Sequence, residues 1–238
     1  MTILTQPPVS PSAAGAPLEP SFIFRAARQV WRLTGNRLLD AIHATARVMR
    51  NALTRRVGRS DYKRWSSPQG LEAWWDQRTE RIARLVPVGS NVIEFGAGRR
   101  QLERFLPAGC TYTPSDLVDR GPGTIVCDLN LRPLPNLLVA APKVAVFGGV
   151  LEYIRDVPAL AHWLADGGVK TCVASFDPVP AGLGIIGRCR ESIRRTYYGY
   201  MNSLTEEEFL RSFAAAGFAC AQRQTWTTQV IVRLVKEP

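Results

Sequence analysis

Short hydrophobic runs alternate with amphipathic stretches from residue 61 onward. Runs rich in Val, Ile, Phe and Thr predict strands at Asn91–Phe95, Thr111–Pro114, Thr124–Cys127, Val144–Phe147 and Thr171–Ser175. Apolar residues at helical spacing predict helices at Leu71–Leu85, Arg100–Phe105 and Val157–Leu164. Strands and helices that alternate in this way indicate an α/β fold, with a mainly parallel sheet and helices on both faces.

The C-terminal part departs from this alternation. A helix is predicted at Leu204–Ala215 and a turn at Gly217, followed by two β-rich runs, Phe218–Thr225 and Gln229–Val235. Only a few residues separate these runs, so they should pair as an antiparallel hairpin at the sheet edge. The predicted sheet therefore has seven strands.

The N-terminal residues have a different composition. Residues 1–20 contain five prolines, which predicts a disordered tail. From Ser21 to Leu53 apolar residues recur at helical spacing, and two short amphipathic helices broken near Gly35 and Asn36 fit this pattern. We therefore expect a tail and helical extension over residues 1–60 and one domain over residues 61–238.

The charge is concentrated in this extension. The chain carries a net charge of +10, and residues 1–64 hold 11 Lys and Arg against three acids. The near-neutral remainder disfavours nucleic acid as a partner. Arginines beside an apolar stripe are typical of a helix on an anionic membrane surface, here through residues 21–60, but also of a helix packed on the domain. A mitochondrial transit peptide has a similar composition, although Glu19, Asp40 and the early prolines argue against one.

Two further features bear on location. No window offers 18 consecutive apolar residues, which disfavours a spanning helix. The five cysteines are scattered, and neither a disulfide framework nor a zinc site is expected. We therefore predict a cytoplasmic protein that is at most peripheral on the cytoplasmic membrane face.

The clearest chemical signal is VIEFGAGRR, residues 92–100. A hydrophobic strand containing Glu94 leads into Gly96, Ala97 and Gly98 at the predicted start of a helix. Glycines let the backbone approach a ligand closely, and a helix N-terminus favours an anionic group. A dinucleotide fingerprint would need glycine at position 101, which is Gln101, so NAD and FAD are disfavoured.

Polar residues follow the next three strands at the same sheet edge. Asp116 lies 22 positions after Glu94, where a carboxylate can accept hydrogen bonds from two ribose hydroxyls. Asp128 and Leu129 offer an acceptor and an apolar contact for an adenine. The segment FGGVLEYI, residues 147–154, adds small and polar residues after the fourth strand.

Residues 61–235 resemble the class I S-adenosylmethionine-dependent methyltransferases. The resemblance rests on the glycine turn after Glu94, on Asp116, on Asp128-Leu129, on residues 149–152 and on the C-terminal hairpin. It implies a Rossmann-like methyltransferase fold and S-adenosylmethionine as cofactor. In two places the sequence departs from the family. Arg100 stands where many members have a third glycine, and Asp116 and Asp128 are too close for a helix between them, which leaves Asp119 as a competitor for the ribose role.

The resemblance assigns expected roles. The cofactor-binding residues would be Glu94, Gly96, Ala97, Gly98, Asp116, Asp128, Leu129, Gly149 and Val150. Some relatives carry a Glu-His pair after the fourth strand, with a metal role in certain cases. Here the pair is Glu152-Tyr153, so no metal is predicted, and Glu152 or Tyr153 is the candidate catalytic group.

The acceptor is expected beside two groups of aromatic and basic residues. Tyr62 and Trp65 could close the site as a lid. Arg194, Arg195, Tyr197 and Tyr198 suit a phosphate or carboxylate next to an apolar or sugar ring, although a solvated helix with a packed aromatic end explains the same pattern.

The sequence thus predicts methyl transfer to a small-molecule acceptor, anionic, saccharide or lipid-linked. Two alternatives stay open. One is a degenerate Rossmann-like binding protein anchored through its basic N-terminal helices, which Arg100 and the short second crossover favour. The other is an RNA or protein methyltransferase.

Overall fold

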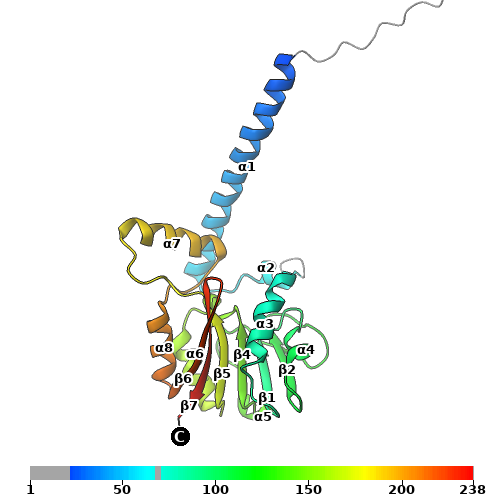
Figure 1. The fold of residues 1–238 in the computed structure, drawn as a ribbon, viewed down its shortest axis with the longest axis vertical. Coiled ribbons are helices and arrows are strands. Elements are labelled where there is room, and N and C mark those ends of the chain that lie inside the picture. The colour runs from blue at the N-terminus through cyan, green and yellow to red at the C-terminus, as the bar shows by residue number, and fades with distance from the viewer. Residues whose placement is uncertain (1–21, 68–70, 238) are drawn as a thin grey trace, which may run out of the picture. The chain divides into compact units, whose positions relative to one another are not determined.

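The computed structural model describes residues 22–67 and 71–237, and its chain divides into two units between Thr45 and Ala46. The first unit contains the start of α1, and the second contains the end of α1 and every other helix and strand (Figure 1). The boundary between these two units falls inside α1. Asn51, near the end of α1, donates hydrogen bonds to the main chain of α7 (Ile185–Tyr198), which explains why residues 46–57 belong to the second unit.

α1 is one helix from Phe22 to Val57, so the predicted break near Gly35 and Asn36 is wrong. Glycine in a helix interior costs only about 1 kcal/mol relative to alanine and, unlike proline, removes no hydrogen-bond donor. The predicted tail at residues 1–20 lies outside the described residues.

The sheet has the predicted seven strands. They are β1 (Asn91–Phe95), β2 (Thr111–Asp116), β3 (Ile125–Val126), β4 (Val144–Gly148), β5 (Thr171–Phe176), β6 (Phe218–Trp226) and β7 (Gln229–Lys236). Their order is β3-β2-β1-β4-β5-β7-β6, with β1 to β5 parallel and β7 antiparallel to both β5 and β6. The Rossmann-like methyltransferase topology expected from the sequence is confirmed.

The remaining helical elements precede the first strand or connect later ones. They are α2 (Tyr62–Ser66), η2 (Ala73–Trp75), α3 (Asp76–Ala83), α4 (Leu102–Phe105), α5 (Leu137–Ala140), η3 (Leu151–Tyr153), α6 (Val157–Asp166) and α8 (Glu206–Ala214). The helix predicted at Leu71–Leu85 is the short 3-10 turn η2 followed by α3. Among the described residues, no helix is both long enough and apolar enough to cross a membrane.

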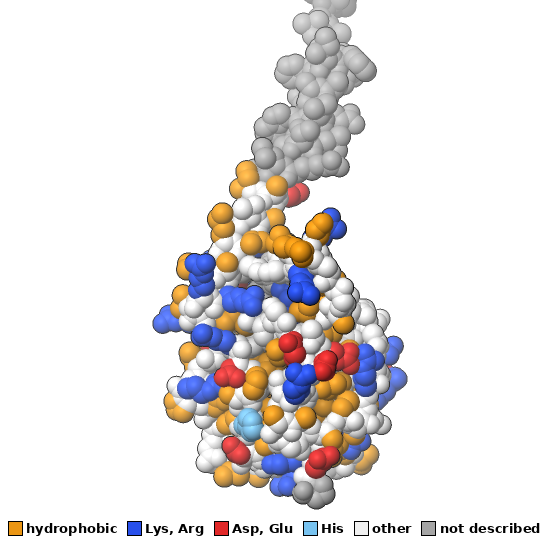
Figure 2. All heavy atoms as spheres, turned by 90° about the vertical axis from the view of Figure 1, so that its left-hand side faces the viewer, with side chains coloured by type: hydrophobic (Ala, Val, Ile, Leu, Met, Phe, Trp, Pro, Cys, Tyr) orange, Lys and Arg blue, Asp and Glu red, His pale blue; other side chains and the backbone are white. Residues whose placement is uncertain are grey.

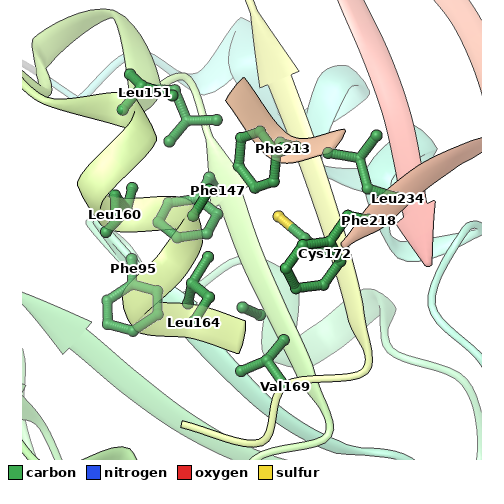
Figure 3. Close-up of a cluster of buried hydrophobic side chains, with 14 of the residues drawn as sticks. Phe95, Phe147, Leu151, Leu160, Leu164, Val169, Cys172, Phe213, Phe218 and Leu234 are labelled. Carbon is green, nitrogen blue, oxygen red and sulfur yellow. The ribbon is translucent and has the colours of Figure 1, made fainter. Parts of the chain in front are cut away.

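Alternation along the strands builds one core on each face of the sheet. Ile93 and Phe95 of β1 point to the face covered by α6 and α8, while Val92 points to the face covered by α3 and α4. In the first core Phe95 stacks on Phe147 of β4 with ring centroids 5.0 Å apart (Figure 3). Each such buried side chain contributes about 1.5 to 3 kcal/mol.

The parallel strands all end at one edge of the sheet, where ligands of open α/β folds bind. The glycine turn follows β1, Asp116 ends β2, Asp128 follows β3 and Gly149 follows β4. In Figure 1 this is the upper edge, over which α2 and α7 lie. The fold therefore brings the polar residues after these strands to one place.

Candidate active site

The glycine turn has a backbone that requires glycine. Gly96 has φ of 72° and Gly98 has φ of 51°, in the left-handed region that L-residues rarely adopt. A Cβ on Gly96 would lie 2.3 Å from Cγ2 of Val150, which follows β4. The turn therefore lies directly against the end of β4 and leaves its own backbone open to the cavity beside it.

Arg100 adopts the conformation of the glycine it replaces. Its φ is 56°, and its guanidinium donates to the main-chain oxygen of Pro122 and to Glu103. The side chain therefore reaches across to the loop between β2 and β3 and does not line the cavity. The departure from glycine leaves the space next to the turn clear.

Asp116 faces the glycine turn from the end of β2. Its Oδ2 accepts a hydrogen bond from the Gly98 N–H at 2.8 Å, and its Oδ1 accepts from the Leu117 N–H and from Arg120 Nη2. Oδ1 thus has two donors, whereas Oδ2 has one and can accept a further hydrogen bond. The competing Asp119 is exposed, accepts from the Gly121 N–H and does not line the cavity. Of Asp116 and Asp119, only Asp116 is therefore available to a ligand in this cavity.

Asp128 follows β3 and is held by the segment before α2. Its Oδ1 accepts hydrogen bonds from Ser60 Oγ at 2.7 Å and from the Asn130 N–H at 2.9 Å. Asn130 also bonds the Ser60 hydroxyl and the main-chain oxygen of Tyr153. Leu129 is buried beside them. This wall thus combines a fixed carboxylate with an apolar side chain.

Glu94 is a buried acid at the floor of the cavity. Burial raises the pKa of its carboxyl to about 8, against the opposing effects of a hydrogen bond from the Tyr112 hydroxyl and of the Arg78 charge. At neutral pH the group is therefore largely protonated, and an approaching cation would favour its ionised form.

Arg78 of α3 is a buried cation beside the end of β4. Its Nη2 donates to the Gly148 oxygen at 3.0 Å and its Nη1 to Gln229 Oε1, and burial lowers its pKa. A Cβ on Gly149 would lie 2.3 Å from Nη1, so the glycine makes room for the guanidinium. Arg78 Nε has no hydrogen-bond partner among the described residues.

Glu152 of η3 is buried with one oxygen unpaired. Its Oε1 accepts hydrogen bonds from the Asp177 N–H at 2.8 Å and from Gln229 Nε2, whereas Oε2 has no partner in the described part of the chain. Burial raises the pKa of this carboxyl to about 7. A carboxylate with such a pKa can accept a proton near neutral pH.

An aromatic wall stands beside Glu152. Tyr153 packs edge-on against Trp65 of α2 and against Tyr200, with centroids 4.9 and 5.3 Å apart. The Arg64 guanidinium lies 4.4 Å above the Trp65 ring. Tyr200 in turn donates to Asp177, which also pairs with Arg194 of α7. Asp177, directly after β5, thereby holds Tyr200 of this aromatic wall in place.

One cavity of about 710 Å³ joins these parts. The predicted residues that line it are Trp65, Glu94, Gly96, Ala97, Gly98, Asp116, Asp128, Leu129, Gly149, Val150, Glu152, Tyr153, Arg194, Tyr197 and Tyr198. In the described residues no group of three or more His, Cys, Asp or Glu side chains is placed to hold a metal ion.

Two predicted substrate residues lie outside the cavity. Arg195 is fully buried, and its guanidinium donates to the main-chain oxygens of Asn202 and Asp177, so it supports the fold. Tyr62 is half exposed, and its hydroxyl donates to the Leu117 oxygen. Neither side chain lines the cavity, and both hydrogen-bond the protein's own main chain.

Arg78, Arg120 and Gln229 are among the lining residues that the sequence did not single out. Arg78 had a readable signal, since it shares the apolar face of its helix with Trp75 and Ile82. An arginine on such a face needs a buried partner or a ligand. Arg120 and Gln229 carry no comparable signal, because only the folded chain brings them to the cavity.

No family model and no curated protein matches this chain significantly. Solved structures of methyltransferases do share its fold. The mitomycin 7-O-methyltransferase MmcR aligns over 82% of this chain and 67% of its own, with a TM-score of 0.57 and 13% identity. The neocarzinostatin O-methyltransferase NcsB1 aligns over 82% and 69%, with a TM-score of 0.52 and 18% identity.

Human N-acetylserotonin methyltransferase is a third similar structure, with a TM-score of 0.53 and 12% identity over 75% of this chain. The chain spans only 57% of the length of that enzyme. At these identities the likeness establishes the fold, which is that of the class I methyltransferases.

Proposed function

We propose that this protein transfers a methyl group from S-adenosylmethionine to a small-molecule acceptor. The observation that carries the proposal is the hydrogen bond from the Gly98 N–H to Asp116, which directs the glycine turn and the acid toward the same cavity. The human enzyme and NcsB1 were crystallised with S-adenosylmethionine, NcsB1 also with 2-hydroxy-5-methyl naphthoic acid. The shared fold supports the same cofactor here.

The polar groups that line the cavity suit the cofactor. The turn at Gly96 has no room for a side chain, so main chain alone faces the ligand. Oδ2 of Asp116 would accept a hydrogen bond from a ribose hydroxyl, which contributes about 1.5 to 3 kcal/mol because the acceptor is charged. Asp128 and Leu129 would contact the adenine, with the carboxylate accepting from its exocyclic amine.

The amino-acid end of the cofactor would lie between Glu94 and Arg78. The ammonium group favours ionised Glu94, whose pKa burial raises to about 8 in the free protein. The unpartnered Nε of Arg78 offers a buried donor for the carboxylate. Together with Gly149, which makes room for the guanidinium, these groups would fix the direction of the bound molecule.

A bound sulfonium supplies an electrophilic methyl group that an in-line nucleophile displaces from sulfur. The protein's own part is to orient the acceptor and take up its proton. Glu152 is our candidate base, because Oε2 is unpaired and the carboxyl has a pKa of about 7. Tyr153 is not suited to this role, since burial raises its pKa, and we assign it to packing against the acceptor.

The acceptor side favours a planar or apolar body with an anionic group. The rings of Trp65, Tyr153 and Tyr198 supply the apolar wall. Arg47 and Arg64 also line the cavity, and both guanidiniums lie over aromatic rings, where they can bind a carboxylate or phosphate. We further propose that the basic residues between 21 and 60 approach an anionic membrane surface.

Isothermal titration with S-adenosylmethionine tests the cofactor. Wild type should bind, and Asp116→Ala should weaken binding at least tenfold. Asp119→Ala is the matched control, because Asp119 belongs to the same loop but does not line the cavity. If wild type does not bind, the chain is a degenerate Rossmann-like binding protein and the proposal fails.

Methyl transfer is tested with isotopically labelled donor and cell extract, followed by mass spectrometry of the products. We expect label in a small molecule, lost in Glu152→Gln. Label appearing only in RNA or protein would instead establish the alternative class of acceptor.

A further inference from the structure

The last turns of α1 carry an exposed apolar stripe. Met49, Leu53 and Val57 follow one another at intervals of four residues, and Met49 and Leu53 are 68% and 63% exposed. Residues at this spacing lie on one face of a helix. The stripe is unusual, because large apolar side chains in series normally face a core.

α7 carries a second stripe. Ile185 and Ile193 are 83% and 60% exposed, and the exposed Cys189 lies between them at the same interval of four residues. Ile186 next to Ile185 is 72% exposed. The first turn of α7 therefore presents two isoleucines to solvent.

The two helices are joined to each other. Asn51 Nδ2 donates to the main-chain oxygens of Thr196 and Tyr197 at 3.0 and 2.9 Å, which caps the end of α7. The Arg47 guanidinium lies 4.2 Å from the centre of the Tyr197 ring. Figure 1 places the end of α7 beside the cyan end of α1. Residues 46–57 and 185–198 are thus held together, and we call their exposed side chains the α1–α7 surface.

This surface is strongly basic. Residues 46–57 contain four arginines and no acid, and residues 185–198 contain four arginines and one acid, Glu191. Glu191 is already paired with Arg194. Figure 2 shows hydrophobic and basic side chains side by side over the upper part of the molecule, on the side where α7 lies. Arg195 is buried, and Arg194 and Arg50 are paired with acids, whereas Arg188 and Arg190 of α7 have no acidic partner among the described residues. Exposed isoleucines beside Arg188 and Arg190 suit a partner that is both apolar and anionic.

A second copy of the chain fits this surface poorly. In a symmetric dimer the same patch would face itself and bring arginines such as Arg188 and Arg190 against each other. A bilayer containing anionic lipids offers the complementary chemistry, with acyl chains for the isoleucines and phosphates for the guanidiniums.

We propose that the α1–α7 surface docks on an anionic lipid bilayer, with Ile185 and Ile186 inserted at the level of the headgroups. Arg47, Tyr197 and Tyr198 belong to this surface and also line the cavity. Docking therefore brings the cavity to the lipid. Resting on the proposed function, we infer that the methyl acceptor is an amphiphile with an anionic headgroup that is taken from the membrane.

Vesicle flotation of the full chain tests the docking. Wild type should float with vesicles of phosphatidylcholine containing 30% phosphatidylglycerol, but not with phosphatidylcholine alone, and 0.5 M salt should weaken the binding. Ile185→Ser with Ile186→Ser should lower the partition coefficient at least tenfold, since burying each side chain is worth roughly tenfold or more. Arg188→Gln with Arg190→Gln should lower it by roughly fivefold per arginine.

The matched control is Val88→Ser with Leu138→Ser, which removes two exposed aliphatic side chains from the opposite edge of the sheet. It should float like wild type. Equal flotation of the isoleucine variant and this control would overturn the proposal. A wild-type dimer in light scattering that the isoleucine variant abolishes, without vesicle binding, would also overturn it and make the surface a contact between copies.

Titration with S-adenosylmethionine separates this inference from the proposed function. We expect the isoleucine variant to bind the cofactor like wild type, because neither isoleucine lines the cavity. Normal cofactor binding without flotation refutes the docking alone, whereas flotation without cofactor binding refutes the methyltransferase.

Discussion

Arg120 and Asp116 form an ion pair at the carboxyl end of β2, with Nη2 3.2 Å from Oδ1 and both side chains less than 10% exposed. The same Nη2 also donates to the main-chain oxygen of Trp65 in α2. One guanidinium therefore links the acid proposed to bind ribose with the helix that overlies the cavity. We therefore expect ligand binding at Asp116 and the position of α2 to be coupled through this group.

Arg120→Gln should weaken both the fold and cofactor binding. Asp116 would keep only main-chain donors, and losing a charged hydrogen bond costs about 1.5 to 3 kcal/mol in the free energy of unfolding. We expect that loss in urea melts and at least a tenfold higher Kd for S-adenosylmethionine in titration. Arg104→Gln, on the exposed side of α4, is the control and should change neither. An unchanged Kd in Arg120→Gln would show that α2 and the ribose acid are not coupled.

Gly96→Ala should destabilise the protein and abolish cofactor binding. The new Cβ would lie 2.3 Å from Val150 Cγ2, and the positive φ costs about 1 to 2 kcal/mol for a residue with a side chain. We expect a total loss above about 2 kcal/mol, because overpacking alone costs about 1 to 3 kcal/mol. Adding Val150→Ala removes the clash and should recover that part of the stability.

Gly89→Ala isolates the backbone contribution. Gly89 has φ of 69°, yet a Cβ there would meet no atom within 4 Å. The free energy of unfolding that Gly89→Ala loses in urea melts should therefore match the loss that remains in the Gly96→Ala, Val150→Ala double variant. A loss for Gly96→Ala as small as that for Gly89→Ala would contradict the close packing of the turn on β4.

Glu152→Gln should change the pH dependence of stability. The pKa of Glu152 rises from 4.5 to about 7 on folding, so between these values the folded state holds one more proton than the unfolded state. The free energy of unfolding then falls as pH rises, by up to about 1.4 kcal/mol per pH unit. The variant lacks this contribution, so its stability relative to wild type should increase from pH 4.5 to 7 and level off above. Urea melts at several pH values give the free energy of unfolding against pH for both proteins. Parallel curves for wild type and Glu152→Gln would refute the raised pKa of Glu152.

Asn51→Ala should loosen the end of α7. The side chain is buried and makes two hydrogen bonds to main-chain oxygens, each worth about 0.5 to 1.5 kcal/mol. We expect the free energy of unfolding to fall by about 1 to 3 kcal/mol. Amide hydrogen exchange should become faster than in wild type in residues 194–198, and more so than in β4. Gln222→Ala on the exposed side of β6 should change neither. Unchanged exchange in α7 would mean that its end is held by other contacts.

The sheet was predictable because its strands are β-rich runs between turns, and the central ones are apolar, as Val144–Phe147 illustrates. Turn residues and spacing likewise located the glycine turn and Asp116, since each lies directly at the end of a predicted strand and its position depends on local structure. α1 was harder to predict, because Gly35 weakens a helix without breaking its hydrogen bonds.

The roles of side chains whose partners lie far away in the sequence were not predictable. Arg194 and Arg195 are neighbours in one basic run, yet the first reaches the cavity wall and the second is buried against Asn202. Gln229 is ordinary in the sequence, and only the pairing of β7 with β5 brings it next to Glu152. Tertiary contacts, not local pattern, decide these roles.

The strand order also constrains the order of assembly. β6 precedes β7 along the chain, but in the sheet it touches only β7, which separates it from β5. While the ribosome still holds residues 229–236, β6 has no place to dock and the edge of β5 is open to other chains. A nascent polypeptide of this protein therefore passes through a stage that needs protection from aggregation. That stage ends only when the hairpin of β6 and β7 docks on β5 as a unit.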